Sequence, residues 1–598
     1  MNAPSLTHVL LDRFQSTPWH VAYEVRDGER WRTWTWDEVG RVVAELSAGL
    51  IAIGLQIGDC AAVLAHTRVE WVLADFAVLC ARGATTTIYP SSTADDCRYI
   101  LQDASVRFAI VEDAEQLAKL ESVWAELPGL RGIVCIDGDS EDPRVWSWSR
   151  LRALGRGWLV EHGEEAWRER ALGASAEDLA TLIYTSGTTG RPKGVRLVHD
   201  CWLAQAEALA PIVRDARQPD DKLFVWLPLA HAYGKVLQLT GVVYDVPTAI
   251  DGDISRLARS LAETRPTYVP AVPRVFEKMH NRIVSGVRAR GDRVFRVFQW
   301  ASRVGSEVSE LRRAGKRVPP GLWVQHRLAD RLVFQKIRAG LGGRIRAFLS
   351  GSAPLSDELQ HFFDGAGLLV LEGYGLTECA AVATANRPDD LCTGTVGKPA
   401  SGMEVRISEQ GEVQLRGRAV MRGYHNLPEA TEAAFEDGWF RTGDLGTLDE
   451  HGFLRITGRI KELIITSGGK NIAPAPIESA VKARCPLIQE VVMMGDRRNF
   501  CTALITLDRD SVRSWAESRG KPTDLASLAG DPEVRSEIAA AIETVNHGLG
   551  SFETLKDFVV LDTDFSLESG ELTPSQKVRR AVVAERYGAL LDRFYSRS

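Results

Sequence analysis

Residues Thr181–Val195 read TLIYTSGTTGRPKGV, a short apolar run that turns abruptly into a polar loop. The run Leu182–Tyr184 predicts a strand. The loop after it combines hydroxyl side chains, glycines and cations: Thr185, Ser186, Thr188 and Thr189; Gly187, Gly190 and Gly194; Arg191 and Lys193. Glycine lets successive backbone N–H groups surround an anion, while hydroxyls and lysine add donors and charge. This composition predicts a polyphosphate-binding site.

The loop does not follow the spacing of the P-loop nucleotide-binding motif. That motif has a second glycine five places after the first, and a Ser or Thr after the lysine. Here Pro192 stands five places after Gly187, and Gly194 follows Lys193. The alternative to a phosphate site is an ordinary surface loop rich in Ser and Gly.

Seven further motifs follow this loop along the chain. They are Ser350–Pro354 (SGSAP), Gly373–Glu378 (GYGLTE), Tyr424–Asn426 (YHN), Gly438–Asp444 (GWFRTGD), Gly458–Leu463 (GRIKEL), Thr466–Pro474 (TSGGKNIAP) and Gly570–Lys577 (GELTPSQK). In order and composition the eight motifs resemble the adenylate-forming superfamily, and within it the AMP-forming long-chain acyl-CoA synthetases. The resemblance implies an enzyme that activates a fatty acid with ATP and Mg²⁺ and passes the acyl group to CoA.

The composition is that of an ordinary soluble globular protein. Of 598 residues, 45% are hydrophobic and 25% are charged, with a formal net charge of −7. We find no run of 18 apolar residues that would predict a transmembrane helix, and no secretory signal at the N-terminus. Nine cysteines are scattered singly without a CxxC pair, which predicts reduced thiols in a cytoplasmic enzyme. We expect Cys379 to line the pocket wall rather than act as a nucleophile.

Alternation of helix-like and strand-like segments predicts the fold class. Apolar residues recur at helical spacing in Trp36–Ile53 and Val69–Cys80, and Cys60–Leu64 between them is strand-like. Such alternation is typical of α/β layers with mainly parallel sheets. Short segments separated by Gly turns between Thr395 and Ile456 predict a small β subdomain.

Two structural units are expected. The first is a large N-terminal adenylation domain (1–458) of layered α/β sheets plus the small β subdomain. A hinge (459–461) leads to the second unit, a small, mobile α+β C-terminal domain (462–598).

The segment 274–346 is strongly basic. It contains 18 Lys or Arg against 5 Asp or Glu, an excess of 13 positive charges, and it is predicted to be helical. Three interpretations stay open: peripheral contact with an anionic membrane surface, attraction of the CoA phosphates, or a solvated helix face. Nucleic acid is not expected as a partner, because no recognised binding motif accompanies the charge.

The resemblance assigns the phosphates and the metal ion of ATP. Activation of a carboxylate needs positioned phosphates, a cation near the attacking oxygen and a metal carboxylate. Residues 185–190 and Lys193 would hold the β- and γ-phosphates. Glu378, directly after Thr377, would hold Mg²⁺ together with Thr185, because hard oxygen ligands suit that ion. The alternative for Glu378 is a solvated acid at a helix start.

The residues assigned to the nucleoside are Gly351, Ser352, Ala353, Gly373, Tyr374, Gly375, Asp444 and Arg459. Tyr374 would offer a flat face to adenine, and Asp444 would accept both ribose hydroxyls. Arg459 would add donors toward the ribose or the α-phosphate. The alternatives are core packing for Tyr374 and a simple salt bridge between Asp444 and Arg459.

The resemblance assigns the two chemical steps to different residues. Lys577 would bridge the substrate carboxylate and the α-phosphate during adenylation; its alternative is an inert surface lysine. Lys461 would act at the hinge, so that Lys577 leaves and the segment Ser467, Gly468 and Gly469 faces the active site and opens a channel for CoA. His231 would lie beside the acyl carbon, to shape or gate the site or to act as a base; a packing histidine is the alternative.

The identity of the acid remains open at this stage. Thr267–Lys278 and Thr466–Pro474 resemble the long-chain branch. After His231, however, the chain reads Ala-Tyr-Gly-Lys, where long-chain members more usually have a bulky residue, an acid and Arg. The alternatives to a fatty acyl-CoA synthetase are a ligase for a specialised acid or a carrier-protein acceptor, and a non-catalytic binding protein. The oligomeric state is not predicted.

Overall fold

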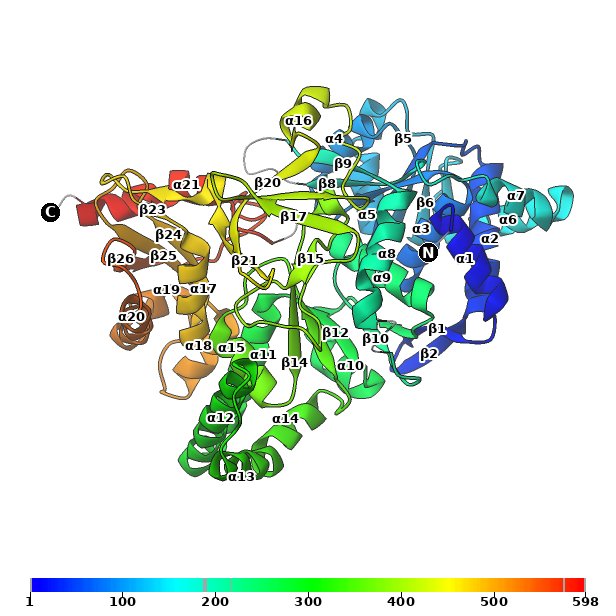
Figure 1. Cartoon of the computed structure of the whole chain (residues 1–598). Coiled ribbons are helices and arrows are strands. Elements are labelled where there is room, and N and C mark those ends of the chain that lie inside the picture. Colours follow the sequence, from blue (N-terminus) through cyan, green and yellow to red (C-terminus); the bar gives the residue numbers. More distant parts are fainter. Residues whose placement is uncertain (1–2, 186–190, 214, 216, 574–575, 596–598) are drawn as a thin grey trace.

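The computed structural model of the chain describes residues 3–185, 191–213, 215, 217–573 and 576–595 (Figure 1). Two mainly parallel sheets with helices on them form most of the molecule. An antiparallel β unit lies beside them, and the C-terminal residues form a separate unit of sheet and helices.

The first sheet contains the strand that leads into the Thr- and Gly-rich loop. Its spatial order is β7 (Val145–Ser147), β6 (Gly132–Asp137), β5 (Val106–Asp113), β3 (Cys60–Leu64), β4 (Ala84–Ile88), β8 (Leu179–Thr185) and β9 (Lys193–Val198). Neighbours are parallel except β8 and β9, which pair antiparallel with Thr185 opposite Lys193. This pairing brings both ends of the loop together.

The N-terminal third also contains helices that pack on this sheet or on one another. They are α1 (Leu6–Ser16), α2 (Trp36–Ala52), α3 (Val69–Cys80), α4 (Ala94–Asp103), α5 (Ala114–Glu121), α6 (Trp148–His162) and α7 (Glu164–Leu172). Strands β3 and β4 are buried along their whole length, as expected of parallel strands covered on both faces. The helix, strand and helix predicted over 36–80 are confirmed.

The second sheet brings two of the motifs to one edge. Its spatial order is β16 (Lys398–Pro399), β15 (Thr384–Ala385), β14 (Leu369–Tyr374), β13 (Ala347–Ser350), β12 (Tyr268–Ala271), β10 (Leu223–Val225), β11 (Thr248–Ile250), β1 (Val21–Asp27) and β2 (Arg30–Thr35). β13 and β14 are parallel neighbours and end at Ser350 and Tyr374. Ligands bind at the carboxyl ends of strands in such sheets, so this edge is where a site is expected.

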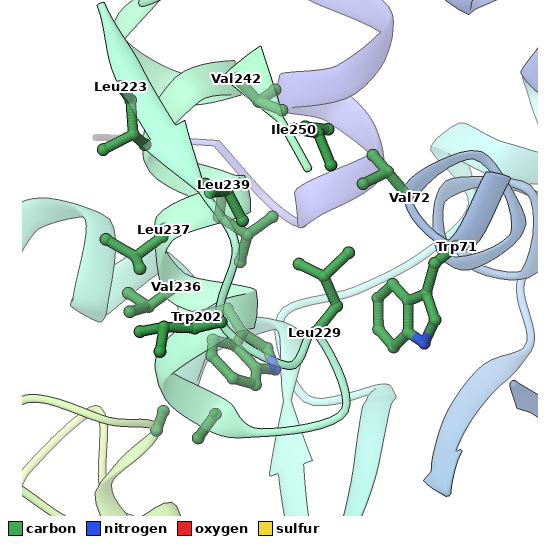
Figure 2. Packing of buried hydrophobic residues seen from close by; sticks show 14 of the residues in the cluster. Trp71, Val72, Trp202, Leu223, Leu229, Val236, Leu237, Leu239, Val242 and Ile250 are labelled. Atoms are coloured by element: carbon green, nitrogen blue, oxygen red, sulfur yellow. The ribbon is translucent and has the colours of Figure 1, made fainter. Parts of the chain in front are cut away.

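Helix α9 (Ala232–Tyr244) packs between α8 (His199–Val213) and α3. It is apolar on nearly every side, which is typical of a buried helix. Figure 2 shows Val236 and Leu237 on the opposite side of α9 from Trp71 and Val72 of α3. One face of α9 therefore joins the core, and the other is available to line a cavity.

The basic segment is helical, as predicted. Its surroundings comprise α10 (Leu257–Thr264), α11 (Pro273–Arg288), α12 (Asp292–Arg313), α13 (Pro320–Ala329), a π-helical turn (Asp330–Phe334), α14 (Gln335–Gly340) and α15 (Asp357–Gly365). In Figure 1 α12, α13 and α14 extend away from the two sheets.

The predicted β subdomain is also present. It contains β17 (Met403–Ile407), β18 (Glu412–Gly417), β19 (Phe435–Glu436), β20 (Trp439–Leu448) and β21 (Leu454–Arg459), with α16 (Pro428–Ala433) between β18 and β19. β20 and β21 pair antiparallel, and their register places Asp444 opposite Arg459.

The C-terminal unit has its own sheets and helices. It contains β22 (Ile464–Ile465), β23 (Asn471–Ile472), α17 (Pro474–Arg484), β24 (Ile488–Met494), β25 (Cys501–Leu507), α18 (Arg509–Glu517), α19 (Leu525–Gly530), α20 (Pro532–Asn546), β26 (Leu555–Val560) and α21 (Arg580–Tyr595). Its buried apolar residues run from Ile464 to Leu591 and form clusters separate from the core that ends at Leu454.

The predicted fold class is confirmed: a large α/β N-terminal domain with a small β subdomain, followed by a small α+β C-terminal domain. The domain limits and the hinge at 459–461 stay predictions. None of the described helices combines the length and the apolar character needed to cross a membrane.

Candidate active site

A cavity of about 1250 Å³ opens where the two sheets, the β subdomain and the C-terminal domain meet. Among the described residues, most of the predicted site residues line it: Thr185, Lys193, His231, Gly351, Ser352, Ala353, Gly373, Tyr374, Gly375, Thr377, Glu378, Asp444, Arg459, Lys461 and Lys577. The predicted residues Ser186, Gly187, Thr188, Thr189 and Gly190 lie outside the described residues.

Glu378, Tyr424 and Lys193 come together at one side of the cavity. The Tyr424 hydroxyl donates to Glu378 Oε1 at 3.0 Å. Lys193 Nζ lies 4.8 Å from the centre of the Tyr424 ring, a cation–π distance. Burial raises the pKa of Glu378, although the bond from Tyr424 opposes this rise. Glu378 thus presents to the cavity a carboxyl group that is held by Tyr424.

Asp444 connects two of the predicted nucleoside residues. Arg459 Nε donates to Asp444 Oδ1 at 2.6 Å, and the Tyr374 hydroxyl donates to Oδ2 at 2.6 Å. The salt bridge considered as an alternative is therefore present. Each carboxylate oxygen has two lone pairs, so Asp444 can still accept from a ligand. The hydroxyl bond fixes the ring of Tyr374 in the cavity wall.

The backbone beside these residues is tightly constrained. A side chain at Gly375 would place its Cβ 1.8 Å from the carbonyl oxygen of Ala381, so close chain packing requires glycine there. Ser352 adopts a φ of +74°, in the left-handed region that most side chains avoid. Strained residues of this kind cluster at functional sites.

Lys577 enters the cavity from the C-terminal domain. Its backbone is held on both sides by Thr573: the Thr573 N–H donates to Lys577 O at 2.8 Å, and the Lys577 N–H donates to Thr573 Oγ1 at 3.0 Å. Lys577 is exposed, and it lines the cavity. Desolvation and the nearby Arg459 guanidinium lower the pKa of Lys577, while Asp444 opposes the shift. The two domains thus meet around this ammonium group.

His231 begins helix α9. Its Nδ1 accepts a hydrogen bond from the Tyr233 N–H at 3.1 Å, which caps the helix. Burial, and then the charge of Lys577, lower the pKa of His231 to about 4. The ring is therefore neutral near pH 7, and so low a pKa favours shaping of the site over a role as proton acceptor.

Beyond His231 the cavity continues as an apolar channel between α8 and α9. Its walls consist of Leu209, Ile212 and Val213 from α8, Tyr233, Val236, Leu237 and Thr240 from α9, and Leu223, Val246, Tyr268 and Leu349 from neighbouring segments. The Thr240 hydroxyl donates to Val236 O at 2.7 Å, so it is satisfied within its own helix. Such a channel, lined mainly by apolar side chains, can hold an alkyl chain.

The structure explains the unusual residues after His231. Tyr233 lies in the channel wall, and its hydroxyl donates to Leu349 O at 2.7 Å. Lys235 is fully buried, and its Nζ contacts both oxygens of Asp75 on α3 at 2.6 and 2.7 Å. Removing either partner would leave a buried charge uncompensated, so this pair ties α9 to the core.

One predicted segment lies away from the cavity, and one other sequence prediction is wrong. Ser467, Gly468 and Gly469 are exposed in the β22–β23 hairpin and do not line the cavity in this arrangement of the domains, so their approach to the site after the domain turns stays a prediction. Cys379 was expected in the cavity wall, which is wrong: it is fully buried below the wall, where its thiol donates to Leu376 O. Burial raises the pKa of this thiol to about 12.

Three cavity residues were not predicted as site residues. Tyr424 occurs in a motif, but only the fold shows that it bridges Glu378 and Lys193. Tyr233 stands where long-chain members more usually have another residue, and nothing in the sequence indicated that it lines the cavity. Burial raises the pKa of Glu372 to about 8, and its Oε2 accepts from the Leu355 N–H at 3.3 Å. A carboxyl group directly before the Gly-Tyr-Gly turn was the available signal for Glu372.

The arrangement can support acyl activation. One end of the cavity presents an ammonium, a guanidinium and carboxyl groups around an aromatic ring, which suits a nucleotide. The other end is an apolar channel of helix faces. A molecule with a charged head and a long apolar tail fits both ends together.

Comparison with known proteins places the chain among related sequences. Residues 11–425 match the family model for the AMP-binding enzyme, and residues 461–598 match that for the AMP-binding enzyme C-terminal domain. The chain is 37% identical over 593 residues to the long-chain-fatty-acid–CoA ligase FadD15 of Mycobacterium tuberculosis, covering 98% of this chain and 96% of that protein. It is 32% identical to the long-chain-fatty-acid–CoA ligase ACSBG2 of Rattus norvegicus, covering 100% and 93%.

Solved structures share the fold at lower identity. The A domain of a carboxylic acid reductase from Segniliparus rugosus, in complex with AMP and a co-purified carboxylic acid, matches with a TM-score of 0.74 at 20% identity, covering 100% of this chain and 95% of that one. The O-succinylbenzoate CoA synthetase from Bacillus subtilis, in complex with ATP and magnesium, matches with a TM-score of 0.65 at 22% identity, covering 96% and 98%.

Proposed function

The chain belongs to the AMP-binding enzyme family, and we propose that it is a long-chain fatty acid–CoA ligase of fatty acid metabolism. The carboxylate of the acid attacks the α-phosphorus of ATP and displaces pyrophosphate, which gives an acyl-adenylate. The thiol of CoA then attacks the acyl carbon, loses its proton and displaces AMP. Relatives that match nearly the full length of the chain carry this activity in their names.

The observation that carries the proposal is the continuity of the cavity. The charged nucleotide residues, His231 and the apolar channel residues all line one cavity, so a single ligand can occupy both ends. An acyl-adenylate is such a ligand, with a charged nucleotide on one side of the acyl carbon and an alkyl chain on the other.

Lys577 and Arg459 supply positive charge for the first step. During in-line attack, negative charge is distributed over the α-phosphate and the entering oxygen, and preorganised cations stabilise it. Lys577 must be protonated for this role, and burial together with the Arg459 charge lowers its pKa. Tyr374 and Asp444 bind the adenine and the ribose in this proposal.

The residues present fit a magnesium ion that arrives with ATP. Mg²⁺ at phosphates commonly uses one or two protein carboxylates, with phosphate oxygens and water as its other ligands. Glu378 supplies one carboxyl group toward the cavity, and Thr185 at the end of β8 lines the same cavity with its hydroxyl. Among the described residues there is no cluster of three or more acidic, His or Cys side chains that would form a dedicated metal cage. Bound there, the ion would neutralise phosphate charge.

The second step requires a different arrangement of the domains. In this proposal Lys577 stands at the acyl carbon during adenylation, where the CoA thiol has to enter afterwards. We propose that the C-terminal domain turns about residues 459–461, which carry Lys461 in the short η5 turn (Ile460–Glu462) after β21. The exposed segment 467–469 would then move toward the cavity and admit CoA.

The basic helices suggest where the enzyme meets its lipid substrate. Six large apolar side chains on α12, α13 and the π-helical turn are between 42% and 59% exposed: Val294, Val297, Trp323, Val324, Leu328 and Leu332. They lie within the segment that has an excess of 13 positive charges. We propose that this face contacts an anionic membrane surface of the cytoplasm. Sedimentation with phosphatidylglycerol vesicles should be lost in Trp323→Glu, and equal sedimentation of the variant would contradict the proposal.

A direct assay tests the proposed ligase activity. The purified protein is incubated with ATP, Mg²⁺ and straight-chain acids of increasing length, and AMP, pyrophosphate and acyl-CoA are measured with and without CoA. The proposal predicts acyl-CoA and AMP with long acids. Pyrophosphate release that CoA does not discharge would indicate a different acyl acceptor, and no release with any acid would contradict the function.

A further inference from the structure

A group of four charged side chains joins the C-terminal domain to helix α11 of the large domain. Lys482 Nζ lies 3.0 Å from Glu490 Oε2 and 3.7 Å from Glu277 Oε2. Arg274 Nη1 lies 3.5 Å from Glu490 Oε1. Arg274 and Glu277 belong to α11, whereas Lys482 is on α17 and Glu490 is on β24. We call these four side chains the interdomain cluster. Positive and negative charges alternate in it, and two of its contacts join the two domains: Arg274 to Glu490 and Lys482 to Glu277.

The interdomain cluster is partly shielded from water. The side chains of Glu277 and Lys482 are each 15% exposed, and that of Glu490 is 16% exposed. Burial raises the pKa of Glu277. Burial alone would lower the pKa of Lys482, but the negative charges of Glu490 and Glu277 outweigh burial, so the pKa of Lys482 is raised. Charges in such surroundings attract one another more strongly than exposed pairs do. Lys482 is therefore held partly by the acid of the opposite domain.

The same elements hold the start of α21, which follows Lys577 closely in the chain. Arg580 donates to Met493 O at 2.7 Å and to Glu478 Oε2 at 2.9 Å. Glu478 lies on α17, and its other oxygen accepts from the Met493 N–H at 2.6 Å. Arg580 lies three residues after Lys577 in the chain. Its contacts therefore tie the segment that carries Lys577 to α17 and β24.

We propose that the interdomain cluster holds the C-terminal domain in the orientation that places Lys577 in the cavity, which makes Arg274 and Glu277 positioning residues for acyl-adenylate formation. This inference rests on the proposed two-step function. The cluster must break when the domain turns for the thioester step. Figure 1 shows α17 beside α11 and α15, the side from which the domain would have to separate. A second contact there, between Arg484 and Glu358 at 3.4 Å, would part at the same time.

Glu277→Gln separates positioning from general stability. It removes the contact between Lys482 and the large domain, but Lys482 keeps its partner Glu490 and is not left uncompensated. Arg274→Gln removes the other crossing contact. The matched control is Glu24→Gln, which breaks a pair with Lys222 inside the large domain; these side chains are 17% and 19% exposed.

The two half-reactions are then measured separately. Adenylation is followed as pyrophosphate release without CoA, and thioester formation is started from supplied palmitoyl-adenylate and CoA. Both cluster variants should adenylate about tenfold more slowly than the control, with the thioester step unchanged or faster. Equal loss in both steps, or adenylation equal to that of Glu24→Gln, would overturn the inference. A wild-type enzyme that forms no adenylate would contradict the proposed function instead.

A structural readout tests the inference even without activity. Spin labels at Gln410→Cys and Lys556→Cys, one exposed site in each domain, report the interdomain distance by pulsed EPR. The wild-type background should give one narrow distribution, and Glu277→Gln should broaden or shift it. An unchanged distribution in Glu277→Gln and in Arg274→Gln would show that the cluster does not hold the domains.

Discussion

The two ends of the cavity are built in different ways. At the nucleotide end, charged and aromatic groups come from short motifs, and Asp444 has defined partners in Arg459 and Tyr374. At the acyl end, the wall is made of helix faces from α8 and α9 without a shared motif. The chemical steps thus depend on individual side chains at the nucleotide end, whereas selection of the acid depends on the size and shape of the apolar channel. Single substitutions should therefore stop the reaction at one end and change only the preferred substrate at the other.

Lys577→Ala should have the largest effect at the nucleotide end. Loss of the ammonium group removes preorganised positive charge at the reacting oxygens, so adenylation should fall by at least about 100-fold. Thioester formation from supplied acyl-adenylate should continue, because Lys577 has to leave before that step. Quench-flow measurement of both steps checks this expectation. Loss of both steps to the same extent would remove Lys577 from its proposed role.

Glu378→Gln should impair adenylation by about 100-fold through weaker binding of magnesium with ATP. The amide keeps the shape and the bond to Tyr424 but has no negative charge. A titration with MgCl₂ should show a higher Mg²⁺ requirement in the variant. Tyr424→Phe is the matched control, since it removes the hydrogen bond and keeps the carboxyl group. An unchanged Mg²⁺ requirement in Glu378→Gln would place the ion elsewhere.

Thr240→Trp should change the preferred acid at the acyl end. The larger side chain fills the channel beside Val236 and Leu237, so kcat/KM for hexadecanoic acid should fall by about 10- to 100-fold while that for butanoic acid is retained. Thr240→Val keeps the volume and serves as the control. A chain-length profile is measured for all three proteins. Equal losses for short and long acids would show that the variant disturbs the fold rather than the channel.

The smallest expected effect concerns two buried histidines, one in the cavity wall and one outside it. Burial lowers the pKa of His231 and of His199 from 6.5 to about 4. Between these values the unfolded chain binds protons that the folded protein does not bind. The free energy of unfolding should therefore fall as the pH falls from 6.5 toward 4, by on the order of 1–2 kcal/mol for each histidine at pH 5.

Urea unfolding at pH 7 and pH 5 measures this difference. His199→Asn and His231→Asn should each reduce the pH dependence, since the carboxyl groups are common to all the proteins compared. Only the His231 variant should also change enzymatic activity. A pH dependence that neither substitution alters would contradict the proposed protonation states.

The sequence allowed residues at the nucleotide end of the cavity to be predicted, but not those at the acyl end, for a physical reason. Lys577 and Glu378 could be proposed because their roles depend on residue type within local motifs. Leu209 and Val246 could not, because an apolar side chain has the same local pattern in a channel and in a core. Which apolar side chains line the channel depends on how α8, α9 and the neighbouring segments pack in the fold.

The fold class could be predicted from the sequence, but the contacts between the domains could not. Alternating helix-like and strand-like segments predicted the α/β layers, and short segments with Gly turns predicted the β subdomain, because each element has its own local pattern. Glu277 and Lys482 lie more than 200 residues apart in the sequence, and only the tertiary arrangement of the domains brings them together. The exposed position of Gly468 likewise depends on the domain arrangement rather than on its motif.

The most direct test of this account is a crystal structure with a non-hydrolysable palmitoyl-adenylate analogue. We expect the adenine against Tyr374, the ribose at Asp444, the ammonium group of Lys577 at the acyl-phosphate junction, and the alkyl chain between α8 and α9. An alkyl chain bound outside this channel, or a nucleotide bound away from Tyr374 and Asp444, would contradict the claim that one continuous cavity holds both parts of the intermediate.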